Sequence, residues 1–279
     1  MESPRLAEIR RLDPQRDAAR IAHLLACYEF PWDMTRSLEI ALFRTFAVPA
    51  ISALLDRTGE FRLRAQRRYD DTDILVSELL EWGYDSERGR KALRRINQQH
   101  GRFAIANQEF LYVLSTFVYE PIRWNQRFCW RAMTETERLG LFHFWRAVGQ
   151  RMGIRDIPEN YAAFEVFNRD YEAAYIHPAE SNHRVGSAVL DMFCGWFPAM
   201  LGPWVRHGIV ALLDRPVIAA FGFAAPPRWL RTLVPCALRL RARLLRMLPK
   251  LRRPRLRTLD QHRSYPDGYS IERLGPPGT

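Results

Sequence analysis

Apolar residues recur at helical intervals along almost the whole chain, and this periodicity constrains the fold more than any other feature. No convincing run of alternating apolar and polar residues predicts a β-strand. A chain of 279 residues with 47% apolar residues is long enough to build one sizeable core. The sequence therefore predicts an all-α protein with a single multi-helix globular domain.

Capping residues indicate where these helices begin. We expect helix starts at the following positions: Asp13 with Pro14, Pro31 with Asp33 as cap, Pro49, Asn107, Thr134 with Glu137 as a capping box, and Pro158. Residues 186–225 are apolar but repeatedly interrupted by proline and charged residues, so they lack the roughly 20 uncharged residues of a spanning helix. This segment is therefore predicted to form short buried helices or a protein surface that contacts lipid.

The stretch 64–101 predicts two consecutive helices. Asp70 or Asp71 can cap the first helix, which has apolar residues at helical spacing and can end at Gly83. The second helix then ends on a histidine, His100.

This second helix has its own start and stop signals. Asp85 or Ser86 can cap its first turn, and Gly101 stops it. His100 therefore lies in the last turn, where a histidine interacts favourably with the helix dipole whether or not it binds anything. From spacing alone, a structural histidine and a metal-ligating histidine are both open interpretations.

An acidic cluster, Asp70, Asp71 and Asp73, also has two interpretations. Carboxylates in a helical protein can hold Mg²⁺ and a substrate diphosphate, as in a Mg-dependent terpenoid enzyme. The third aspartate is one residue early for that motif, and no second metal motif follows. Acidic residues that complement the positive end of a helix dipole are the simpler explanation.

The excess positive charge lies in one segment. Residues 226–258 contain eleven basic and no acidic residues, and the rest of the chain contains 31 of each sign. Within 228–253, one stripe is apolar (Leu233, Ala237, Leu240, Leu244, Met247, Leu251) and another is basic (Arg239, Arg243, Arg246, Lys250, Arg253). This amphipathic helix either docks on the core or attaches to a membrane surface. No nucleic-acid-binding motif accompanies the charge, so we expect no nucleic-acid partner.

The cysteines and the N-terminus bear on localisation. Four scattered cysteines form no Cys-x-x-Cys pair, which argues against a disulfide scaffold or a zinc ribbon: Cys27, Cys129, Cys194 and Cys236. The N-terminal residues show no apolar signal region. We expect a cytoplasmic protein with no signal peptide or clear transmembrane helix, and peripheral membrane attachment remains open.

Several segments together resemble a known family. The stretch RRINQQHGRFAIANQEFLYVLSTFVYEPIRW, together with YEFPWDMTRSLEIAL, RRYDDT and YPDGYSIERLGP, is similar to haem-dependent oxygenases of the MpaB-like and latex-clearing rubber oxygenase family. The similarity extends along nearly the whole chain and is closer to the MpaB-like branch. It implies a haem b pocket between the helices of the domain.

The resemblance also implies roles for particular residues. His100 corresponds to the proximal haem-iron ligand, and Arg68 and Thr72 correspond to an Arg-x-x-x-Thr pair on the opposite face of the haem. Asp71 stands where the rubber-cleaving branch has lysine, which argues against a polymer substrate. Cationic candidates for the haem propionates are Arg64, Arg67 and Arg95.

The implied reaction is oxidative cleavage of a C=C bond in an apolar, isoprenoid-like molecule with O2. The alternative is a non-catalytic haem-carrying or membrane-associated helical protein. In domain terms we expect a catalytic domain over 1–225, a basic amphipathic segment over 226–258 and a loop-like tail over 259–279.

Overall fold

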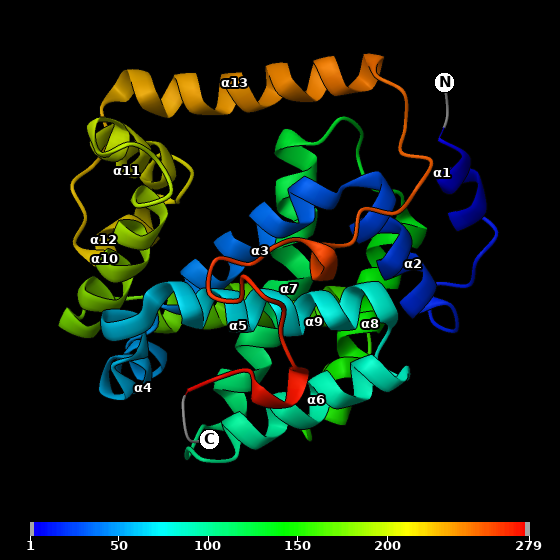
Figure 1. Ribbon diagram of the computed structural model, residues 1–279, viewed down its shortest axis with the longest axis horizontal. Coiled ribbons are helices and arrows are strands. Elements are labelled where there is room, and N and C mark those ends of the chain that lie inside the picture. Colours follow the sequence, from blue (N-terminus) through cyan, green and yellow to red (C-terminus); the bar gives the residue numbers. More distant parts are fainter. Residues whose placement is uncertain (1–2, 277–279) are drawn as a thin grey trace.

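The computed structural model describes residues 3–276 and confirms the all-α prediction (Figure 1). Within the described residues there is no β-strand, only an isolated bridge between His262 and Tyr265. The α-helices are α1 Pro4–Ile9, α2 Ala18–Leu24, α3 Pro31–Thr45, α4 Pro49–Thr58, α5 Glu60–Trp82, α6 Glu87–His100, α7 Asn107–Phe128, α8 Glu135–Arg151, α9 Tyr161–Tyr175, α10 Glu180–Cys194, α11 Gly202–Val210, α12 Arg215–Phe221 and α13 Arg228–Met247. A π-helical turn, Leu25–Glu29, links α2 to α3.

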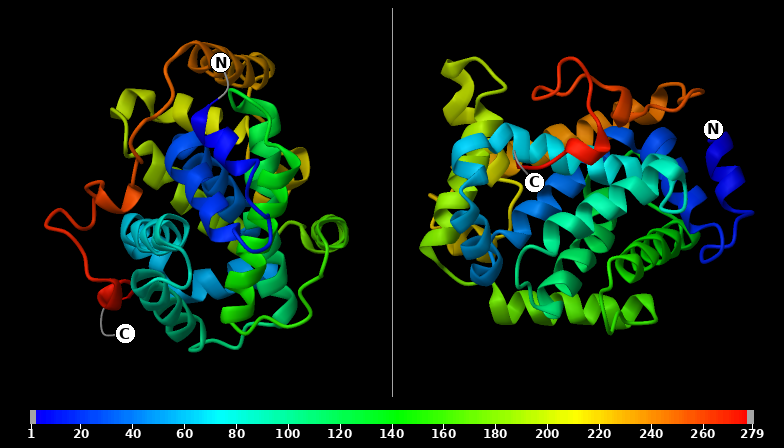
Figure 2. Two further views of the ribbon diagram at one scale, coloured as in Figure 1. Left: turned by 90° about the vertical axis from the view of Figure 1, so that its right-hand side faces the viewer. Right: turned by 60° about the horizontal axis from the view of Figure 1, so that its bottom comes forward.

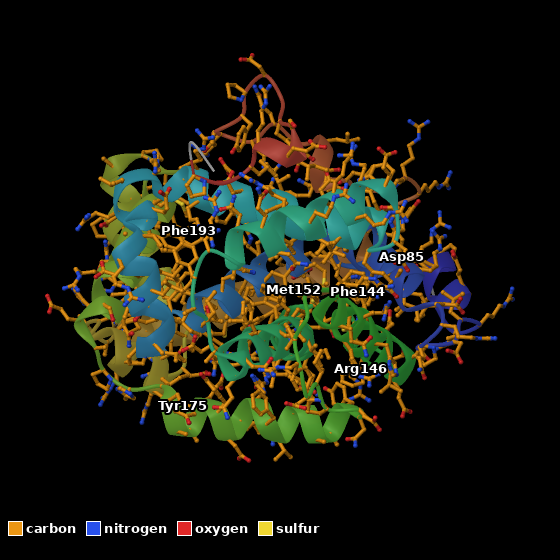
Figure 3. All side chains as sticks on the ribbon, turned by 90° about the horizontal axis from the view of Figure 1, so that it is seen from below. Asp85, Phe144, Arg146, Met152, Tyr175 and Phe193 are labelled. Carbon is orange, nitrogen blue, oxygen red and sulfur yellow. The ribbon has the colours of Figure 1, made fainter. Side chains whose placement is uncertain are left out.

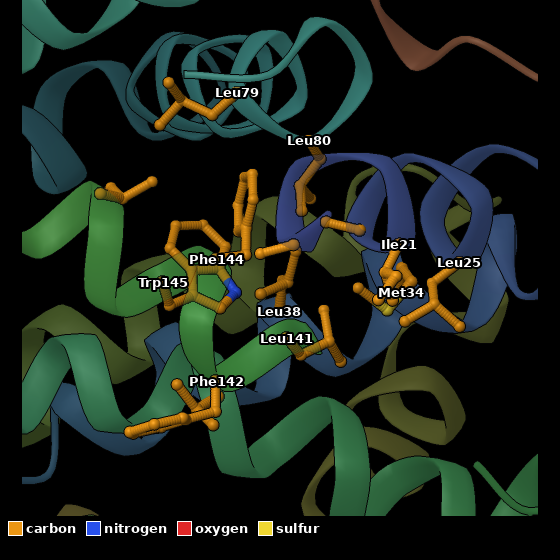
Figure 4. Close-up of a cluster of buried hydrophobic side chains, with 14 of the residues drawn as sticks. Ile21, Leu25, Met34, Leu38, Leu79, Leu80, Leu141, Phe142, Phe144 and Trp145 are labelled. Atoms are coloured by element: carbon orange, nitrogen blue, oxygen red, sulfur yellow. The ribbon is translucent and has the colours of Figure 1, made fainter. Parts of the chain in front are cut away.

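The largest hydrophobic core lies among α2, α3, α5, α7 and α8. Phe144 and Trp145 of α8 are at most 1% exposed, and Ile21, Leu38 and Leu79 contribute to the same cluster from three other helices (Figure 4). A second cluster joins α3 to α10 and α12. In the view from below, side chains fill the spaces between the helices (Figure 3).

Helix α5 differs from the sequence expectation. It is one helix that starts at Glu60 and is kinked at Arg64 (φ −146°, ψ 46°). Asp70 and Asp71 therefore lie inside the helix, and the prediction that one of them caps it was wrong. The chain turns into α5 at Gly59, whose φ of 68° suits glycine.

Three other predicted starts are corrected by a few residues. Asp13 accepts hydrogen bonds within the turn that precedes α2, and α2 itself begins later, after Asp17. Asp33 lies within α3, where its carboxylate accepts a hydrogen bond from Trp124 instead of capping. Asn160 caps α9, so Pro158 precedes that helix. Asp33 has a distant competing partner that the local sequence does not reveal, whereas the shifts at Asp13 and Pro158 involve residues only two or three positions away.

Other predicted helix starts are confirmed. The Ser86 side chain accepts from the Gly89 N–H at the start of α6. Thr134 and Glu137 form the capping box of α8. Pro49 begins α4 as expected. Helix α7 also begins at Asn107, but its N-cap is Ala106, and the Asn107 side chain bonds the backbone of Arg155 instead of capping the helix.

Helix α13 lies across one side of the molecule, at the top of Figure 1, and Figure 2 shows it from two other directions. It ends at Met247, so the predicted amphipathic segment 228–253 is helical only up to this residue. Of its residues only Leu230 and Ala242 are buried. The segment that follows crosses back over α5 and α6, so the tail is better packed than a free loop: Leu274 is fully buried.

No single helix in the described part of the chain is long and apolar enough to cross a membrane. The pair α3 and α4 passes a length and composition test together, but the two are bent by 97° at their junction. Much of α3 is buried in the core.

Candidate functional site

The candidate site lies where α5, α6 and α7 approach one another. Arg68 and Thr72 are one turn apart on α5, and His100 is the last residue of α6. Phe110, in the first turns of α7, packs against the His100 ring with centroids 5.3 Å apart and planes at 67°. The sequence placed His100 in a last helical turn, and the structure confirms this.

The His100 imidazole is neutral and has an unused ring nitrogen. Its Nδ1 is buried and has no hydrogen-bond partner among the described residues. Burial, together with the positive charge of Arg68, lowers the pKa of His100 to about 4. A neutral, unpartnered imidazole is the form in which histidine binds metals.

Arg68 is a half-buried cation whose positive charge acts on this imidazole. One guanidinium nitrogen, Nη1, donates to the Thr72 hydroxyl, and that hydroxyl donates to the Arg68 carbonyl at 3.0 Å. The guanidinium carbon lies 5.6 Å from the centre of the Phe61 ring. Burial lowers the pKa of Arg68, and no carboxylate lies within ion-pair distance of it in residues 3–276. Its charge is therefore available to a ligand.

Arg68 and Thr72 line a cavity of about 250 Å³. Its apolar wall is formed by residues of α3, α5, α7 and α10, which include Leu38, Leu42, Phe46, Phe61, Phe117, Val189 and Phe193. His100 is not one of the lining residues, although the Arg68 charge acts on it. Arg68 thus both lines the cavity and acts electrostatically on the histidine.

A polar cluster at the other end of the cavity was missed by the sequence reasoning. Glu39 accepts hydrogen bonds from Arg36 at 2.7 Å and from the Tyr69 hydroxyl at 2.5 Å. Burial raises the pKa of Glu39 to about 7, although Arg36 and Tyr69 oppose the shift. The only sequence signal was a charged residue among the apolar positions of α3, since Tyr69 lies 30 residues away.

The three arginines predicted for the haem propionates differ in their environments. Arg64 is at the kink of α5, where it is exposed and pairs with Glu60 at 2.5 Å. Arg95 is buried and donates to the Leu274 carbonyl at 2.5 Å and to Gln98 at 2.8 Å. Arg67 lies 5.6 Å from the Tyr265 ring, and its buried Nε lacks a hydrogen-bond partner in the described part of the chain.

The acidic cluster does not match a metal site. Asp70 accepts from Gln66 at 3.0 Å and from the Ser264 N–H at 2.8 Å. Asp71 accepts from the Tyr265 hydroxyl, and Asp73 pairs with Arg257 at 2.8 Å. Each carboxylate thus has its own partner from the C-terminal segment.

Residues 3–276 contain no group of three or more His, Cys, Asp or Glu side chains that could hold a metal ion. The Mg²⁺ interpretation, and the simpler interpretation as residues at a helix start, are both corrected. The three aspartates attach the C-terminal segment to α5.

Comparisons with known proteins give concordant matches. The family model described as "ER-bound oxygenase mpaB/B'/Rubber oxygenase, catalytic domain" matches residues 37–247. The chain is similar to "ER-bound oxygenase mpaB'" of Penicillium brevicompactum, at 28% identity over 76% of this chain and 55% of the relative. It is 31% identical to "ER-bound oxygenase mpaB" of the same organism, over 76% of this chain and 58% of the relative.

A third relative, "ER-bound oxygenase mpaB" of Penicillium roqueforti (strain FM164), is 29% identical over 60% of this chain and 62% of the relative. The matched part of the chain therefore spans between 55% and 62% of the length of these relatives.

Proposed function

The chain belongs to the family of mpaB-type ER-bound oxygenases and rubber oxygenases, and from this premise we propose that it is a haem b-dependent oxygenase. Its reaction is the cleavage of a C=C bond in an apolar, isoprenoid-like substrate with O2. The observation that carries the proposal is the His100 imidazole, which is neutral, half-buried and unpartnered at Nδ1, and which feels the charge of the half-buried Arg68.

The donor set fits haem b. His100 would hold the iron through a ring nitrogen, because a neutral imidazole with no competing hydrogen bond is a suitable axial ligand. Arg67 is the best placed of the three propionate candidates, since its Nε is buried and unpaired within residues 3–276. Arg64 and Arg95 already have protein partners and would need to exchange them.

Haem iron supplies the centre at which dioxygen is activated. Arg68 and Thr72 present a guanidinium and a hydroxyl to the reacting atoms, and such donors stabilise developing negative charge when they are buried. The Arg68–Thr72 hydrogen bond orients the guanidinium before any ligand binds.

The cavity next to these donors supports an apolar substrate. Most of its wall is aliphatic or aromatic, which favours a hydrocarbon. Its volume of about 250 Å³ lies below the ~300–1,000 Å³ of typical ligand pockets, so a macrocycle and a substrate require side chains to move apart. We also propose peripheral membrane contact through 228–253, which would bring the protein to a place where such substrates dissolve.

The visible absorption spectrum of protein expressed with added haem tests this proposal. We expect a Soret band that is lost in His100→Ala and kept in His143→Ala, which removes a half-buried histidine of α8. Colourless wild-type protein would overturn the haem assignment.

Oxygen consumption distinguishes an enzyme from a haem carrier. With an unsaturated terpenoid, we expect uptake by the wild type and a loss of at least about 100-fold in Arg68→Ala, in line with removal of one charge-stabilising donor. The haem spectrum of that variant should remain. Haem-loaded protein without uptake, across a panel of such substrates, would favour the carrier.

A further inference from the structure

Helix α13 presents a row of large apolar side chains to solvent. Leu240 and Leu244 are each 55% exposed, and Met247 is 82% exposed. These side chains, together with Trp229 and Leu233, share one face of the helix. The apolar stripe that the sequence identified is therefore the exposed one, and α13 docks on the core through a different face.

That docking face contains Leu230, Leu245 and Arg241. Leu230 is buried and Leu245 packs against the main core. Arg241 pairs with the Asp33 carboxylate at 3.0 Å, and its guanidinium lies 3.8 Å from the centre of the Trp32 ring. Because another face already secures the helix, the exposed apolar row is not needed to hold α13 in place.

A second exposed apolar segment adjoins this row. Residues 197–204, FPAMLGPW, contain no charged residue, and Met200 is 80% exposed. Trp204 at the start of α11 meets Trp229 of α13, with ring centroids 5.8 Å apart. We call the exposed face of α13 together with residues 197–204 the apolar rim.

A row of arginines borders the apolar rim along α13. These residues are all exposed: Arg228, Arg239, Arg243 and Arg246. The segment 226–258 has eleven basic residues and no acidic one, so this segment gives the surface beside the rim a positive electrostatic potential.

We infer that the apolar rim is a lipid-binding surface that inserts into the interface of an anionic bilayer. A bilayer offers hydrocarbon to the leucines and anionic headgroups to the neighbouring arginines, at the depths that an amphipathic helix occupies. Trp204 and Trp229 lie at one end of the rim, and tryptophan favours the membrane–water interface. A symmetric dimer through the same face would place two arginine rows against each other, which like-charge repulsion opposes.

The docking face of α13, on the side of the helix away from the rim, adjoins the cavity of the candidate site. Trp32, which contacts Arg241 of α13, lines the cavity, and so does Arg255 in the segment after α13. If the proposed function holds, a bilayer-dissolved substrate reaches the cavity from the α13 side of the molecule. Lipid binding itself does not depend on haem or turnover, so its test uses neither.

Co-sedimentation with phosphatidylcholine vesicles, with and without phosphatidylglycerol, tests the surface. We expect the purified full chain to bind the anionic vesicles, to bind the neutral ones much more weakly and to be released by salt. Leu240→Gln/Leu244→Gln should weaken binding at least about tenfold, since two leucine side chains leave the hydrocarbon. The control Leu63→Gln/Val166→Gln, at apolar positions on α5 and α9 that are 69% and 58% exposed, should bind as the wild type does.

A second pair of variants tests how much the arginine charges of α13 contribute to vesicle binding. Arg239→Gln/Arg243→Gln should weaken binding about 30-fold, at roughly fivefold per charge. The control Arg57→Gln/Arg62→Gln makes the same change of net charge at exposed positions on α4 and α5, and it should have a much smaller effect.

Tryptophan fluorescence locates the contact. A blue shift on addition of anionic vesicles should disappear in Trp204→Phe/Trp229→Phe. Three results would overturn the inference: no binding to anionic vesicles, binding that Leu240→Gln/Leu244→Gln leaves unchanged, or a solution dimer that this variant dissociates. The last result would assign the rim to a second copy of the chain.

Discussion

Helices α8 and α13 both have apolar residues at helical spacing, yet they place them in opposite environments. In α8, Leu141, Phe144 and Trp145 are at most 1% exposed, because α2 and α7 pack on both sides. In α13, Leu240 and Leu244 are more than half exposed, because no described element covers that face. Apolar periodicity therefore predicts a helix in both regions, but it does not predict which apolar face the protein itself buries.

The largest difference should appear when one side chain is truncated in each region. Trp145→Ala should lower the free energy of unfolding by about 3–5 kcal/mol, since it leaves a large cavity in the core. Leu240→Ala should change it by less than about 0.5 kcal/mol, as expected for an exposed position. Urea denaturation measures both, and similar losses would show that α13 is buried in solution.

Arg241 joins α13 to α3 of the main core, and its loss should have the next largest effect. Arg241→Ala leaves the Asp33 carboxylate, which is 5% exposed, without its cationic partner and with the neutral donors Trp124 and Cys129. We expect a loss of about 2 kcal/mol. Hydrogen exchange should rise first in α13. The control Arg239→Ala removes an exposed arginine of the same helix and should leave exchange unchanged.

Glu39, which lines the cavity, should make the free energy of unfolding depend on pH. The pKa of Glu39 is about 7 in the folded protein against 4.5 for an ordinary glutamate, chiefly because of burial. Between these values the folded protein keeps a proton that the unfolded chain releases. The contribution of the Glu39 proton to the free energy of unfolding is therefore fully present below pH 4.5. It falls as the pH rises toward 7, by up to about 1.4 kcal/mol per pH unit.

Glu39→Gln should flatten this slope, as measured by urea denaturation at several pH values in the same buffer series. Part of the slope should remain, because burial also raises the pKa of Glu81 to about 7. Exposed Glu135 provides the matched control, and Glu135→Gln should keep the wild-type slope. An unchanged slope in Glu39→Gln would mean that Glu39 is ionised and solvated in the folded state.

The smallest effect concerns how the two helices begin. Thr134 and Glu137 cap α8 reciprocally, whereas α13 follows Pro227 and has no side-chain cap. Thr134→Ala should cost about 1 kcal/mol. Thr232→Ala, at an exposed threonine inside α13, should be nearly neutral in the same thermal denaturation assay.

Local signals were enough to predict a good part of the candidate site. Ser86 caps α6 and His100 ends it, as the sequence indicates, because a cap needs only residues within one turn. The i, i+4 spacing of Arg68 and Thr72 likewise places them on one face of a helix, and the structure joins them by a hydrogen bond.

The errors about the acidic cluster and Glu39 share one physical origin, which is that these side chains bond to residues far away in the sequence. Asp70 and Asp71 looked like caps, but they meet Ser264 and Tyr265, almost 200 residues later. Glu39 was overlooked because its significance depends on Tyr69 and on burial, neither of which is local.

By itself, the sequence determined that the chain is helical, where most helices end and which histidine closes α6, because spacing and capping act within a few residues. Tertiary structure alone decided that Arg68 lowers the pKa of His100, that Arg68 and Thr72 line a cavity, and that the apolar stripe of α13 faces outward. Burial and charge coupling depend on which elements pack together, and packing joins residues that are far apart along the chain.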